Sequence, residues 1–139
     1  MERRDYILLE IEKIGLILTA IKQKLFGGKE KLAITIDKQM EESKKRLVHE
    51  LNFDLDTFLP LNMNESMRYL DGFKGFNAEN TVSLAEYFSS LGFNDNCVER
   101  KKYLEKAIQL YTISNLQSKT YSLDRETRMV EIKDALKLL

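Results

Sequence analysis

The sequence has little of what stabilises small secreted domains or marks the turns of all-β folds. It contains one cysteine, one proline and six glycines among 139 residues. A single cysteine allows no intrachain disulfide, whereas small secreted domains usually carry several. So little proline and glycine excludes collagen-like and linker-like chains, and it leaves few turn residues for an all-β fold.

The sequence also lacks an excess of either charge and a long hydrophobic run. There are 22 lysine and arginine residues against 22 aspartate and glutamate residues, which argues against a nucleic-acid partner. The longest uncharged stretch near the N-terminus, residues 14–21, is far shorter than the roughly 20 residues that span a bilayer. Acidic residues precede it, unlike in an ordinary signal peptide. We therefore expect a soluble cytoplasmic protein with no membrane partner.

What is present is helical periodicity, and it predicts an N-terminal helical hairpin over residues 1–52. Its first helix, residues 5–26, has apolar residues spaced alternately by four and three, with Asp5 as N-cap and Gly27-Gly28 as the stop. That seam consists of Ile7, Ile11, Ile14, Leu18, Ile21 and Leu25. The second helix, about residues 29–52, carries one apolar face, and the short glycine link predicts an antiparallel pair. That face consists of Leu32, Ile36, Met40, Leu47 and Leu51.

The first helix is apolar on more than one side. Further apolar residues, Leu8, Leu9, Leu16 and Ile17, flank its seam. One antiparallel neighbour covers one stripe, and a second stripe left in water would cost free energy in proportion to its apolar area. We therefore expect a homodimer, formed through Ile7, Ile11, Ile14, Leu18 and Ile21 or through the flanking stripe.

The rest of the chain predicts a packed connector and three further helices, all within a single all-α domain of residues 1–139. The connector, residues 53–76, contains Pro60 and a short helix that starts at Asn62 or Asn64 and ends at Asp71-Gly72. In the repeat-like region 77–139, we expect helices over 78–91, from about 95 to 118, and from 123 onward. Their expected N-caps are Asn77, Asp95 and Ser122, and Gly92 is the expected stop of the first.

From Leu84 onward the pattern resembles a tetratricopeptide repeat. Apolar, small, aromatic and glycine positions of its first helix match Leu84, Ala85, Phe88 and Gly92, and Ala107 and Ile108 resemble the end of its second helix. The turn is about three residues longer than in the repeat, Arg100 replaces a small residue, and no proline ends the second helix. The whole chain is also similar to a poorly characterised family of bacterial helical proteins that open like Asp5-Tyr6-Ile7. This resemblance implies a fold and no activity.

If the repeat geometry holds, its groove would bind a peptide through tyrosines. Tyr87, Tyr103 and Tyr111 are the residues we expect to line it, because tyrosine combines an apolar ring with a polar tip. The alternative for these residues is ordinary core packing. We accordingly predict a non-enzymatic protein–protein interaction module with a protein or peptide partner.

No catalytic, cofactor-binding or metal-binding residue is predicted. His49 is the one histidine, and Arg46 stands where a Glu-x-x-His metal motif would need glutamate. Cys97 lies near a predicted helix N-terminus, close to Arg100 and Lys101, where a thiol pKa falls, but a small packed residue is the simpler interpretation.

A second hypothesis makes the chain a small-ligand binder or an enzyme. Its site would lie between the connector and the C-terminal helical hairpin, near Asp56, Arg68, Tyr69 and Asp71. A pocket with converging polar groups would favour this hypothesis, and a filled or flat surface would oppose it.

Overall fold

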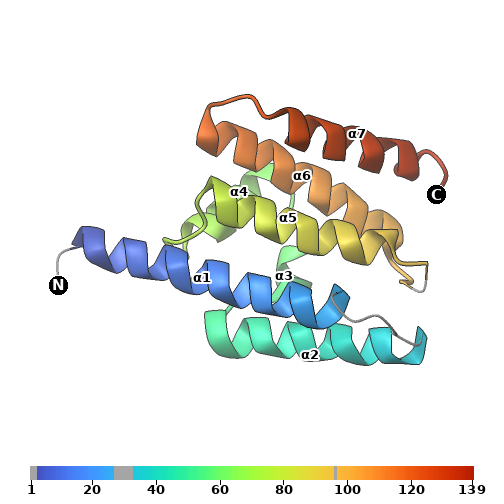
Figure 1. Ribbon diagram of the computed structural model, residues 1–139, viewed down its shortest axis with the longest axis horizontal. Helices are drawn as coiled ribbons and strands as arrows, with labels where there is room; N and C mark the ends of the chain where they lie inside the picture. Colours follow the sequence, from blue (N-terminus) through green and yellow to red (C-terminus); the bar gives the residue numbers. More distant parts are fainter. Residues whose placement is uncertain (1–2, 27–32, 96) are drawn as a thin grey trace. The chain divides into compact units, whose positions relative to one another are not determined.

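The computed structural model describes residues 3–26, 33–95 and 97–139, and these residues form seven α-helices and no strand. The helices are α1 (Arg3–Phe26), α2 (Ala33–Leu51), α3 (Leu55–Phe58), α4 (Met63–Asp71), α5 (Ala78–Phe93), α6 (Arg100–Ser118) and α7 (Leu123–Leu136) (Figure 1). The predicted all-α class is confirmed.

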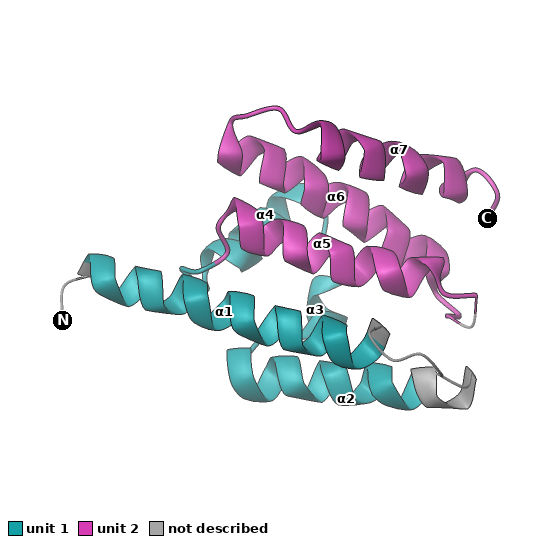
Figure 2. Ribbon diagram, viewed as in Figure 1, with its two compact units in different colours: residues 1–75 teal, residues 76–139 magenta. Residues whose placement is uncertain are grey.

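The chain divides into two compact units, residues 1–75 and residues 76–139 (Figure 2). The first unit holds α1 to α4, so it contains the predicted N-terminal hairpin and the connector. The second holds α5 to α7, the predicted repeat-like region. The boundary lies within one residue of the predicted junction between the connector and the C-terminal helices. That residues 1–139 form a single domain remains a prediction.

In the first unit, α1 packs against α2 through the predicted seam. Ile14, Leu18 and Ile21 are buried on α1, and Leu47 and Leu51 are buried on α2. The helix begins before Asp5, which lies in its first turn, where a carboxylate still favours the positive helix end. The predicted stop at Gly27-Gly28 and the side chains of Leu32 and Ile36 lie outside what the structure describes.

The connector is packed, as predicted, and it contains one helix that the sequence did not reveal. Asp54 caps α3, its carboxylate accepting from the backbone N–H of Asp56 (3.1 Å) and Thr57 (3.3 Å). This four-residue helix ends before Pro60, where a longer one could not continue. It is too short to leave a periodic signal in the sequence.

Helix α4 is capped by Asn62, one of the two predicted caps. The Asn62 side chain accepts from the Glu65 backbone N–H at 2.9 Å, and the Glu65 carboxylate accepts from the Asn62 N–H at 3.1 Å, which completes a capping box. After α4 the backbone runs close to α1, because a Cβ at Gly75 would lie 2.7 Å from Ile14 Cδ1 and 2.8 Å from the Glu10 carbonyl carbon. Glycine is therefore required at position 75.

In the second unit, two helix starts are as predicted and two boundaries are not. Asn77 and Ser122 cap α5 and α7. Gly92 does not end α5 but lies buried in its last turn, where a Cβ would come within 2.6 Å of the Leu104 side chain. The glycine is thus used for close packing of α5 on α6 rather than as a stop.

Helix α6 starts at Arg100, not near the predicted cap Asp95. The Arg100 Nε donates to the Gly92 carbonyl oxygen at 3.0 Å, and its guanidinium lies 3.6 Å from the Asp95 carboxylate. A cation at a helix C-terminus satisfies an otherwise unpaired carbonyl and favours the negative end of the helix. Arginine at position 100, a departure from the repeat pattern, therefore fastens the longer turn.

Candidate functional site

Helix α1 presents an apolar stripe on the side opposite to its buried face. Leu9 and Leu16 precede the buried Leu18 and Leu25 by nine residues each, which is about two and a half turns, so each pair lies on opposite sides. Leu9 is 50% exposed and Leu16 is 65% exposed, and Tyr6, one turn before Leu9, is 53% exposed. We call Tyr6, Leu9 and Leu16 the outer stripe.

The predicted self-association seam lies inside the chain instead. Ile14, Leu18 and Ile21 are 1%, 1% and 2% exposed, and Ile7 and Ile11 are partly buried. A partner could reach the three buried side chains only if α1 were lifted from its neighbours. Of the two surfaces that the sequence suggested for self-association, the flanking one is accessible, through Leu9 and Leu16.

A glutamate and a lysine border the outer stripe midway between its two leucines. Glu12 and Lys13 are both exposed, and they follow Leu9 by three and four residues. At roughly 100° per residue, they lie about 50° to either side of the line that joins Leu9 and Leu16. The stripe therefore has an acidic edge and a basic edge at the same height along α1.

The three tyrosines predicted to line a peptide groove are in the interior. Tyr87, Tyr103 and Tyr111 are 1%, 2% and 2% exposed, and the ring of Phe88 lies 5.5 Å from Tyr87 and 5.7 Å from Tyr103. Burial, together with the nearby charge of Glu86, raises the pKa of Tyr111 to about 12. In this chain these rings pack the core and are not open to a peptide, so the predicted groove gains no support from them.

The residues proposed for a ligand site near the connector do not converge. The Tyr69 ring lies 5.4 Å from that of Phe53, and its hydroxyl accepts from the Asp54 backbone N–H at 2.8 Å. Arg68 and Asp71 are exposed on α4. The Tyr69 hydroxyl is thus used to fix the start of α3 and does not face a ligand site.

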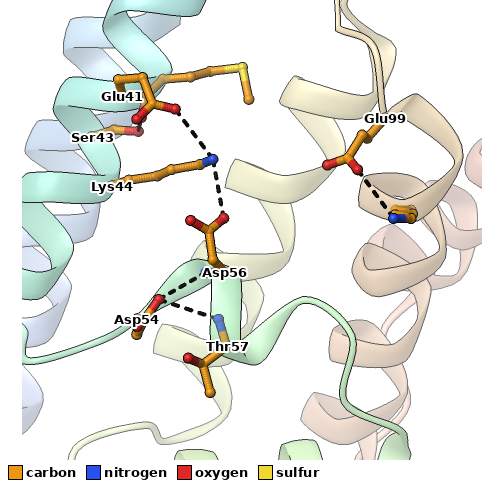
Figure 3. Close-up of polar contacts among 9 residues, drawn as sticks. Glu41, Ser43, Lys44, Asp54, Asp56, Thr57 and Glu99 are labelled. Atoms are coloured by element: carbon orange, nitrogen blue, oxygen red, sulfur yellow. Dashed lines mark hydrogen bonds and ion pairs between the residues drawn. The ribbon is translucent and has the colours of Figure 1, made fainter.

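Asp56, the fourth of these residues, joins α3 to α2. Its carboxylate lies 3.2 Å from Lys44 Nζ, which also lies 3.5 Å from the Glu41 carboxylate (Figure 3). Burial lowers the pKa of Lys44, but the hydrogen bond and charge of Asp56, together with Glu41, outweigh it and raise the pKa above 10.5. This ion-pair cluster fastens α3 to α2.

Two open depressions accompany these contacts, one in each unit. The first, about 380 Å³, has charged and apolar walls on α2 and at α3: Glu41, Lys44, Lys45, Val48, His49, Asp54, Leu55 and Asp56. The second, about 450 Å³, lies by the starts of α5 and α7: Ala78, Glu79, Val82, Ser118, Thr120, Ser122, Asp124 and Arg125. Both carry mixed charge, whereas small-molecule sites are mostly apolar with a few converging polar groups.

His49 and Cys97, the one histidine and the one cysteine of the sequence, have side chains that suit nucleophilic catalysis or metal binding, and the structure gives neither a reactive arrangement. His49 is exposed on α2. Cys97 is 6% exposed and precedes α6 by three residues, so it sits as a small packed side chain. Among the residues that the structure describes, no three histidine, cysteine, aspartate or glutamate residues group as a metal site would require.

Within the same described ranges, no helix combines the length and the apolar character needed to cross a membrane. No protein-family model, curated protein or solved structure matches the chain.

Proposed function

We propose that this chain is a non-enzymatic protein–protein interaction module that forms a homodimer through the outer stripe of α1. The observation that supports the proposal is the exposure of Leu9 and Leu16, half or more of each side chain, on the side of α1 opposite to its core face. Single exposed leucines are normal on protein surfaces. Two of them, spaced by seven residues, are the repeat that a second helix can cover.

The exposed apolar area of the outer stripe gives the free energy that self-association would gain. Each Å² of apolar surface removed from water stabilises by about 25 cal/mol. A second copy that lays the same stripe on this one removes both stripes at once, because a twofold interface uses one patch twice. A surface of this size fits a weak, reversible dimer rather than an obligate one.

The tetratricopeptide-like arrangement of α5 and α6 and a bacterial, cytoplasmic setting are part of the same proposal. Contact between Gly92 and Leu104 supports the first, because the glycine position of that repeat allows its two helices to approach closely. The single cysteine supports the cytoplasmic setting alone, since disulfide-rich composition marks secreted domains.

Sedimentation velocity over a concentration series tests the proposal. We expect a monomer–dimer equilibrium for the wild type and a monomer for Leu16→Lys, because a lysine in the stripe would be desolvated against a second copy. Leu116→Lys is the matched control, at a leucine of α6 that is 56% exposed, and should leave the equilibrium unchanged. Circular dichroism shows whether each variant stays folded.

A wild type that remains monomeric at high micromolar concentration would overturn the proposal. So would a Leu16→Lys variant that dimerises as strongly as the wild type, because the stripe would then lie outside the interface. Loss of the dimer in Leu116→Lys as well would show that the effect is not specific to the outer stripe.

A further inference from the structure

We propose that the two copies pair with their α1 helices parallel, so that Glu12 of each chain faces the partner's Lys13. This inference rests on the proposed self-association and adds its orientation and register. It starts from the placement of the two charges, which border one apolar line at one height on opposite edges.

Symmetry decides which edges meet. In a parallel pair the twofold axis runs along the helices, so the left edge of one stripe faces the right edge of the other. The acidic edge then meets the basic edge on both sides of the contact. Leu9 and Leu16 meet the partner's Leu9 and the partner's Leu16 at the centre.

In an antiparallel pair the twofold axis crosses both helices, and each edge meets its own copy. The register that stacks Leu9 on the partner's Leu16 places the axis level with residues 12 and 13. Glu12 would then face the partner's Glu12, and Lys13 the partner's Lys13. Charges that flank an apolar seam set the orientation of paired helices, and like charges oppose it.

About two turns nearer the N-terminus, the next pair of edge residues follows the same rule. Asp5 lies seven residues before Glu12 and so shares the acidic edge, and Tyr6 lies seven before Lys13 and shares the other. Parallel pairing brings the Asp5 carboxylate to the partner's Tyr6, whose hydroxyl can donate to it.

Exchange of the two charges tests the orientation. In the parallel dimer, Glu12→Lys and Lys13→Glu each replace two attractive pairs with two repulsive ones, and we expect each to raise the dimer Kd about tenfold. The double variant E12K/K13E restores both pairs, so its Kd should return to that of the wild type. In the antiparallel dimer like charges already face each other, so neither the single variants nor the double variant would change Kd in this pattern.

Disulfide cross-linking gives a second, independent measurement. A cysteine at Leu9 should cross-link to the partner's copy of itself in a parallel dimer, because both lie on the contact line. In the antiparallel register, Leu9→Cys would instead cross-link with Leu16→Cys when the two variants are mixed. The wild type is the control, since its own Cys97 is buried.

The outcomes separate the two proposals. A monomeric wild type overturns self-association and the orientation with it. A wild-type dimer that Leu16→Lys dissociates, together with unchanged Kd in both charge variants and no Leu9 self-cross-link, overturns the parallel pairing alone. Restoration of Kd in E12K/K13E together with the Leu9 cross-link supports it.

Discussion

Helices α1 and α6 both carry apolar residues on more than one side, and they differ in how their units cover those sides. Both need cover from more than one direction. Helix α6 packs against α5 and also against α7, which lies along it in the second unit. Within the first unit α1 packs against α2, and its opposite side keeps Leu9 and Leu16 exposed.

A partner is expected on the side of a helix that its own unit leaves uncovered. A helix that is apolar all round is a buried helix in a complete assembly. In the second unit the chain itself supplies the second layer, through α7. In the first unit, we propose that a second copy of the chain covers the outer stripe of α1.

Substitutions on the inner and outer sides of α1 should differ strongly in their cost to protein stability. Leu18→Ala removes a side chain that is 1% exposed and should destabilise the protein by about 2–5 kcal/mol, the usual cost of a cavity. Leu16→Ala, two residues away on the same helix and 65% exposed, should change stability by less than about 0.5 kcal/mol at low protein concentration. Urea denaturation of both variants checks this; equal losses would contradict the assignment of inner and outer sides.

Much of the local structure could be predicted from the sequence because it depends on residues close together. The caps Asn62, Asn77 and Ser122 act on backbone groups within three residues, and Glu65 is in position to complete the box at Asn62. Pro60 correctly predicts that no helix continues through the connector. These signals need no knowledge of the tertiary fold.

What could not be predicted depends on residues far apart. Gly92 has the local signature of a helix stop. Its role is instead set by Leu104, which lies on the next helix, beyond a long turn. Tyr111 is buried because of the helices around it, and nothing in its neighbours along the chain distinguishes a groove residue from a core residue. The same limit applies to α1, whose two apolar sides are equally plausible interfaces until one of them is seen to be buried.

The burial of Tyr111 on α6 predicts a stability that depends on pH. The unfolded chain releases the Tyr111 proton near pH 10, whereas the folded chain holds it to about pH 12, so stability should fall across this interval. The loss attributable to this one group is about 2 kcal/mol. Tyr111→Phe removes that loss, so the stability gap between variant and wild type should move in favour of the variant as pH rises.

Urea denaturation at pH 8 and at a pH near the folded value of about 12 measures that gap. Tyr121→Phe, at a tyrosine that is 75% exposed, is the matched control. Parallel stability curves for Tyr111→Phe and the wild type would show that the cover over α6 does not bury this hydroxyl as the structure has it.

A smaller loss of stability is expected when the hydrogen bonds of Arg125, which join α7 to the end of α6, are removed. We call these hydrogen bonds the tether. Arg125 donates from Nε to the Asn115 side-chain oxygen at 2.7 Å, and from a terminal nitrogen to the Ser118 hydroxyl at 3.1 Å and the Thr120 carbonyl at 2.8 Å. Arg125→Ala removes all three hydrogen bonds and should cost about 1–2 kcal/mol. Because they join the end of α6 to the start of α7, the loss should appear as faster amide exchange in α7 than in α5.

Arg128→Ala is the control on the same helix, since its guanidinium lies 4.0 Å from Asp124 in an exposed pair worth less than about 0.5 kcal/mol. If Arg125→Ala loosens α7, the face of α6 beneath it becomes an uncovered apolar surface like that of α1. The variant should then begin to self-associate through α6, which sedimentation would detect as a second, concentration-dependent species. Exchange rates in α7 that match those of Arg128→Ala would show that apolar packing alone holds this helix, and that α6 keeps its cover without the tether.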